Sequence, residues 1–193
     1  MASDIHALLE SILEQLRRLN RPVVTLLEPE LSDAEIRQLT SSLPFPLPDE
    51  VTELFAWRNG TKRGAAPFQD MALFPVWFLP PIEQAVEEYR GLTVGLADFW
   101  PADSFPILFS GSGDYLGVRC RTAPGGTGEV NSYRLGNTEA IIECSGLKEM
   151  LQTVLASYEE GVFFVDADGD FDVDDERFAE VARRFNPGLE RWK

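Results

Sequence analysis

Hydrophobic residues recur at spacings of three and four in several stretches of the chain, which is the period of a helix with one buried face. Polar residues or prolines that suit the start of a helix precede most of these stretches. The sequence therefore predicts helices over residues 4–19, 32–43, 47–60, 82–90, 145–161 and 177–185.

The stretch Leu47–Gly60 contains the signals of one complete helix. Pro48 suits the first helical position, and the two acidic residues after it place negative charge at the positive end of the helix dipole. Asn59 and Gly60 tolerate a positive φ angle, which allows the chain to reverse after the helix. The apolar stripe that we expect to hold this helix on a sheet consists of Val51, Leu54 and Phe55.

Strand-like runs dominate the second half of the chain, and short connections rich in glycine or proline separate them. These runs cover residues 105–110, 115–121, 130–135 and 139–144. Because the connections are short, the runs predict an antiparallel meander and not the alternating strands and helices of a parallel sheet. Two further apolar runs predict a buried strand over residues 71–79 and a short extended piece over residues 23–27.

These elements predict an α+β fold with a central, mostly antiparallel sheet and flanking helices, in a single domain with an extra N-terminal helix. A chain of 193 residues with 44% hydrophobic content is long enough for one substantial core. We expect an N-terminal helix and extended segment over residues 1–30 and the α+β domain over residues 31–193.

The cellular setting follows from what the sequence lacks. The N-terminus has no secretion-signal pattern, and no apolar run approaches the roughly 20 residues that span a bilayer. Cys120 and Cys144 form no CxxC motif and suit inert, reduced, buried thiols. We therefore expect a cytoplasmic protein.

Of the overall properties of the chain, its net charge says most about the kind of partner it binds. The chain has 32 acidic and 17 basic residues, a net charge of −15 at pH 7. A field of this sign repels nucleic acid and anionic membranes and attracts a basic protein. The alternative explanation is that the charge serves solubility alone.

The motifs that would support catalysis are incomplete. His6 is the only histidine, which excludes every mechanism that needs a His–Asp pair or several histidines on a metal. The glycine-rich connection over residues 111–117 leads into a strand, and it lacks the Lys-Ser or Lys-Thr pair of a phosphate-binding loop. We read it as a hairpin turn and expect no enzyme activity.

Aspartates alternate with other residues over 166–176, as they do in calcium-binding loops. The register of an EF-hand fails, because glycine would be needed where Phe171 or Val173 stands. Three interpretations remain open: bound calcium, an acidic surface for a basic partner, or an exposed turn followed by a helix that Asp172 or Asp174 caps.

Aromatic residues next to acidic ones are candidates for contact with a partner. Trp57 and Trp77 lie in apolar segments and are expected in the core, whereas Trp100 lies in a proline-bounded loop between two aspartates. The candidate partner-binding residues are Asp98, Trp100, Asp103, Asp114, Asp168, Asp170 and Asp172.

Several motifs in order match one known pattern. They are the proline-started helix that ends at Asn59-Gly60, the strand Ile107–Phe109, the segment Gly113–Gly117 and the helix from Ser145 to Leu155. Together they resemble the SUKH superfamily, which includes bacterial immunity proteins and fungal regulators of cell-wall synthesis. The resemblance covers roughly residues 32–192, and the N-terminal helix lies outside it.

The resemblance implies an α+β fold, no catalysis and no cofactor. It implies that the chain binds a cognate toxin, in many bacterial members a nuclease, and neutralises it in the producing cell. The acidic charge suits a basic toxin. The alternative is a regulatory scaffold in cell-wall or signalling pathways.

Overall fold

The central sheet is a meander of four antiparallel strands in the order β1-β2-β3-β4. A computed structural model describes residues 4–97, 99–120, 128–137 and 139–193. In it, Phe109 lies opposite Tyr115 and Val118 lies opposite Val130. The strands are β1 (Ser104–Phe109), β2 (Tyr115–Arg119), β3 (Val130–Tyr133) and β4 (Ile141–Cys144). The predicted meander is confirmed.

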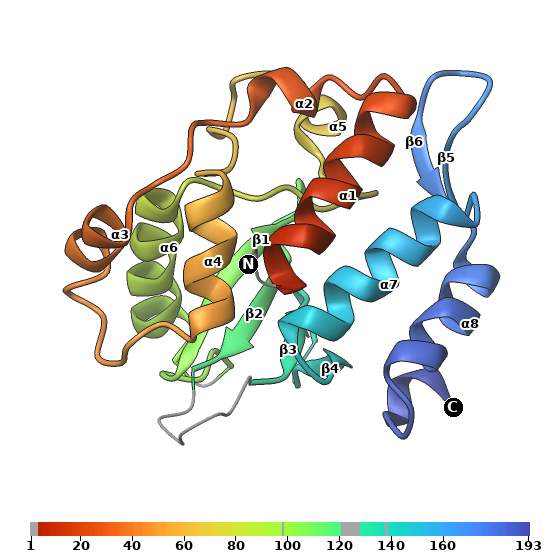
Figure 1. Cartoon of the computed structure of the whole chain (residues 1–193). Coiled ribbons are helices and arrows are strands. Elements are labelled where there is room, and N and C mark those ends of the chain that lie inside the picture. Colours follow the sequence, from red (N-terminus) through yellow and green to blue (C-terminus); the bar gives the residue numbers. More distant parts are fainter. Residues whose placement is uncertain (1–3, 98, 121–127, 138) are drawn as a thin grey trace.

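Helices surround this sheet (Figure 1). They are α1 (Asp4–Arg18), α2 (Val23–Leu26), α3 (Asp33–Leu39), α4 (Asp49–Trp57), α5 (Phe68–Met71), α6 (Ile82–Gly95), α7 (Leu147–Glu159) and α8 (Asp175–Phe185). A 3₁₀ helix, η1 (Glu190–Trp192), ends the chain, and β5 (Phe163–Val165) pairs with β6 (Phe171–Val173) in a separate hairpin. The α+β fold in a single compact domain with an N-terminal helix is confirmed.

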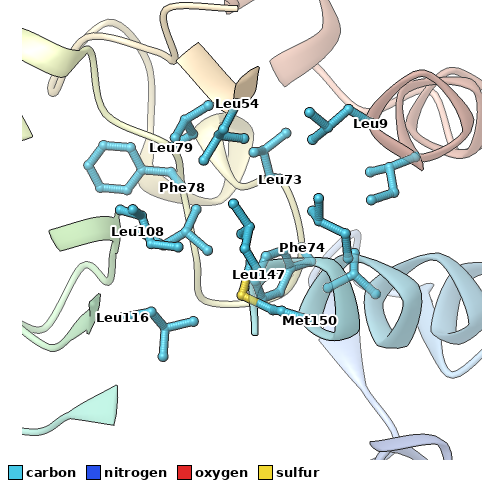
Figure 2. Close-up of a cluster of buried hydrophobic side chains, with 14 of the residues drawn as sticks. Leu9, Leu54, Leu73, Phe74, Phe78, Leu79, Leu108, Leu116, Leu147 and Met150 are labelled. Atoms are coloured by element: carbon cyan, nitrogen blue, oxygen red, sulfur yellow. The ribbon is translucent and has the colours of Figure 1, made fainter. Parts of the chain in front are cut away.

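The main core lies between the sheet and the helices α1, α4 and α7. Helix α1 packs on α7 and α4, and its buried face includes Leu9 and Leu16. Figure 2 shows Leu9 from α1, Leu54 from α4 and Met150 from α7 around Leu73 and Phe74. Leu54 belongs to the predicted stripe of α4, and all three residues of that stripe are buried.

A smaller aromatic core lies apart from the main one. Leu92 of α6 packs there with Trp100 and Tyr133, and the two rings lie 4.1 Å apart between centroids. Gly117 of β2 is needed at this place, because a Cβ would lie 2.7 Å from Ser104 Oγ and 3.0 Å from the Trp100 ring. The aromatic rings of this core pack against the middle strands of the sheet, where Gly117 leaves room for them.

Two predicted extended segments were wrong. Residues 23–26 form α2, because Pro22 starts a turn in which Thr25 N donates to Pro22 O at 3.0 Å. Residues 71–79 are not a regular strand, because Pro75 lies in a tight turn and only isolated bridges form at Phe74 and Phe78.

Several element ends also differ from the prediction. Helix α6 continues through Gly91 to Gly95, because its apolar face extends to the buried Leu92. The N-cap of α7 is Gly146 and not Ser145, whose N–H instead donates to Asn186 Oδ1 at 2.9 Å. The hairpin β5–β6 was not predicted, because its turn lies in the acidic run, where Asp and Gly are poor strand formers.

Candidate partner-binding surface

The acidic run over residues 166–176 forms the turn of the β5–β6 hairpin, β6 and the start of α8. Asp166 Oδ1 accepts hydrogen bonds from the N–H groups of Asp168 and Asp170, at 2.9 and 2.8 Å. Asp174 caps α8 by accepting from Arg177 N at 3.1 Å. The interpretation as an exposed turn and a capped acidic helix is therefore confirmed, with Asp174 and not Asp172 as the cap.

The predicted aspartates of the hairpin differ in their contacts. Asp168, Asp170 and Asp172 are all exposed, and Asp170 Oδ1 also accepts a hydrogen bond from Gln69 Nε2 of α5 at 2.9 Å. In Figure 1 the hairpin lies at one end of the molecule, beside the end of α1 and away from the sheet. No group of three or more His, Cys, Asp or Glu side chains within the described ranges could hold a metal ion.

The other predicted cluster, around Trp100, does not form an exposed surface. The expected exposure of Trp100 was wrong: only 1% of it is exposed, and its indole N–H donates to Ser104 O at 2.9 Å. The Trp100 ring packs with Leu92 and Tyr133 in the small aromatic core. Asp103 pairs with Arg119, with an oxygen to nitrogen distance of 2.8 Å, and Asp98 lies outside the described residues.

Asp114 lies on a groove of about 620 Å³ between the sheet and the C-terminal part of the chain. One wall consists of the Phe74–Trp77 turn and residues of β2, β4 and α7, and the other consists of residues of the hairpin, α8 and η1. Asp175 at the start of α8 lines the same groove. The structure thus places Asp114 and Asp175, which are far apart in sequence, on one groove.

Aromatic rings form a continuous series along this groove. Ring centroids are 6.1 Å apart between Phe74 and Phe163, 5.7 Å between Phe163 and Phe178, and 5.8 Å between Phe178 and Trp192. The series connects the turn after α5 with the C-terminus, across more than a hundred residues of sequence. The sequence does not reveal this set, because each ring by itself has the pattern of a core residue.

The basic residues of the groove are already paired. Glu143 Oε2 lies 3.2 Å from Arg191 Nε, and its Oε1 lies 3.7 Å from a nitrogen of Arg134 and accepts from Ser132 Oγ at 2.7 Å. Trp192 Nε1 donates to Glu143 O at 2.7 Å, which attaches η1 to β4. Glu143 therefore holds the C-terminus against the sheet and balances one of the two positive charges of Arg134 and Arg191.

The two thiols have no reactive environment. Cys120 and Cys144 are both buried and free. Burial raises the pKa of Cys120 to about 12, and it raises the pKa of Cys144 well above the ordinary range, with Glu143 adding to the effect. Neither thiol forms the thiolate that a nucleophile needs at neutral pH.

Comparison with known protein families identifies a family from the middle part of the chain. The model of the SMI1 / KNR4 family (SUKH-1) matches residues 30–153, from the segment before α3 into the middle of α7. None of the curated proteins matches the chain. Among the described residues, no helix has both the length and the apolar character that crossing a membrane requires. With the matched range covering most of its length, the chain belongs to the SMI1 / KNR4 family (SUKH-1).

Proposed function

We propose that this protein is a non-catalytic, cytoplasmic immunity protein that neutralises a basic toxin by direct binding. Membership of the SUKH-1 family supports an immunity or regulatory role in general. The observation that carries the choice of partner is the net charge of −15. A protein of this charge attracts a basic partner and accelerates the encounter with it.

The arrangement of charge supports the same choice. Many basic side chains are used within the molecule, in the pairs Arg58–Glu30, Lys62–Glu28, Arg119–Asp103, Lys148–Asp4 and Arg184–Glu160. By contrast, Asp168, Asp172 and Asp175 form no ion pair with any lysine or arginine of the described residues. Excess negative charge therefore lies on the hairpin and the start of α8.

The test uses the purified protein and the toxin domain encoded beside its gene. We expect nanomolar association that weakens as salt rises, together with inhibition of the toxin. Replacing the hairpin charges with Asp168→Asn and Asp172→Asn should weaken association. The control is Asp33→Asn with Glu87→Gln, which removes equal charge from α3 and α6. A toxin that neither binds nor is inhibited would refute the proposal.

Family membership equally suits a regulatory scaffold for cell-wall or signalling proteins. This alternative expects several unrelated partners and no toxin. Affinity purification from the native cell followed by mass spectrometry distinguishes the two, because an immunity protein should return one dominant basic partner.

A further inference from the structure

One residue on the rim of the groove has an unfavourable backbone conformation. Phe74, Pro75, Val76 and Trp77 form a tight turn in which Trp77 N donates to Phe74 O at 2.9 Å. Proline at the second position and a φ of +76° at Val76 are the pattern of a type II turn, which favours glycine or asparagine at the third position. A β-branched residue at this angle is strained and destabilises the fold.

The valine contributes little packing in return. Its side chain is 52% exposed at the mouth of the groove, beside the half-buried Trp77. A folding requirement alone would select glycine or asparagine at this position, because both relieve the strain without emptying the core. Retention of an exposed, strained apolar side chain is typical of a site where function opposes stability.

Charge in the groove is unbalanced in one direction. Arg134 and Arg191 share the single carboxylate of Glu143. With Asp114, Glu143 and Asp175 against these two arginines, the residues that line the groove carry a net charge of −1. Asp114 receives only neutral donors, Leu135 N and Ser112 Oγ, and Asp175 has no partner among the described residues. Two carboxylates are therefore left to meet cationic groups from outside.

The groove also extends beyond the part shared with the family. Phe74, Val76 and Asp114 lie within the matched residues 30–153, whereas Phe163, Asp175 and Phe178 lie after them. The lining of the groove thus combines residues inside and outside the matched range. Such a composite site can differ between members that share the sheet.

We infer that this groove is the anchor site for the partner, and that it takes a segment with an aromatic or aliphatic side chain flanked by lysine or arginine. The apolar side chain packs against Val76, Trp77 and Phe178, and the basic groups meet Asp114 and Asp175. The inference rests on the proposed function, since it takes the partner to be a basic protein. An apolar anchor with a charged rim is typical of protein interfaces.

Val76→Gly is the decisive variant, because it removes the side chain and relieves the strain together. We expect its midpoint of thermal unfolding to equal or exceed that of the unchanged protein. Val76→Asn gives a second variant that suits the turn. Val94→Ala serves as the control, because it truncates an exposed valine on α6, away from the groove.

The probe is a displayed library of random 12-residue peptides, selected on the full-length protein. We expect the selected peptides to combine basic and apolar residues, and to bind Val76→Gly and Val76→Asn at least tenfold more weakly. Asp114→Asn with Asp175→Asn should lower both affinity and its salt dependence, and Val94→Ala should change neither.

Three outcomes would overturn the inference: no selected peptide, selected peptides without basic residues, or equal binding to Val76→Gly. It also fails if the unchanged protein is a dimer that Val76→Gly dissociates, because the occupant would then be a second copy. The toxin assay is read separately. A toxin that binds all groove variants equally refutes the groove alone, whereas peptides that behave as expected with no toxin bound refute the proposed function alone.

Discussion

Asn59 Oδ1 accepts a hydrogen bond from the backbone N–H of Ile82 across 2.8 Å. The amide of the same side chain donates to Glu83 Oε2 at 3.1 Å. One buried side chain after α4 thereby satisfies the start of α6, which Pro81 leaves without a side-chain cap. The Asn-Gly motif is a connection between two helices as well as a turn.

We expect Asn59→Ala to lower the free energy of unfolding by about 2 kcal/mol, because it leaves a buried N–H group without an acceptor. Urea denaturation followed by circular dichroism measures the change. Asn137→Ala is the matched control, since Asn137 is exposed in a turn, and it should stay within about 0.5 kcal/mol. Equal effects of the two substitutions would contradict the role assigned to Asn59.

Gly60→Ala should destabilise the fold by about 3 kcal/mol, because two effects add. The φ angle of Gly60 is +65°, and a Cβ there would lie 2.4 Å from Pro80 O. Gly91→Ala is the opposite case. It lies within α6 in open space, so alanine should stabilise the protein by about 0.5 to 1 kcal/mol. A stable Gly60→Ala protein would show that the contact at Pro80 relaxes easily.

Both cysteines should resist thiol reagents in the folded protein. At pH 8 we expect no reaction of Cys120 or Cys144 with a disulfide reagent over minutes, because both are buried and their pKa values are raised. In denaturant both should react at once. Cys120→Ser and Cys144→Ser variants assign any signal, and rapid modification of either thiol under native conditions would contradict the buried arrangement.

Glu50 predicts a pH-dependent change in stability. Burial raises its pKa, and the nearby Glu149 of α7 adds to the rise. When the pKa of a carboxyl group is higher in the native than in the unfolded state, the fold favours its protonated form. The contribution of Glu50 to the free energy of unfolding is therefore full at low pH and is lost as the pH rises.

Glu50→Gln should therefore raise the midpoint of thermal unfolding at pH 7. The gain should disappear below about pH 4, where the glutamate is protonated in both states. Scans at several pH values measure it, with Glu87→Gln on the exposed side of α6 as the control. A gain that is equal at pH 3 and pH 7 would exclude the charge as its cause.

An element could be predicted from the sequence where its start and end signals lie within the element itself. The helix of Leu47–Gly60 carries its own start, stripe and stop within one stretch, and the structure has α4 at Asp49–Trp57. The run over residues 71–79 has no such signals. It looks like a strand because it is apolar, but Leu73 and Phe74 are apolar because they are buried beside α1 and α7.

The candidate surface was predictable only in part. Charge pointed to the aspartates of the hairpin, and Asp168, Asp170 and Asp172 are all exposed. Trp100 was misplaced because a proline-bounded loop gives no sign of the Leu92 and Tyr133 side chains that enclose it. The strain at Val76 was equally hidden, because φ angles depend on the turn that the surrounding chain closes.

By itself, the sequence determined the helices with complete end signals, the meander of strands, the acidic charge and the resemblance to one family. The helices and strands depend on residues that are close together in the sequence. The net charge is a sum over all residues of the chain. Only the tertiary structure decided that Trp100 is buried and that Asp114 and Asp175 line the same aromatic groove. Such contacts join residues far apart in sequence, and no local period records them.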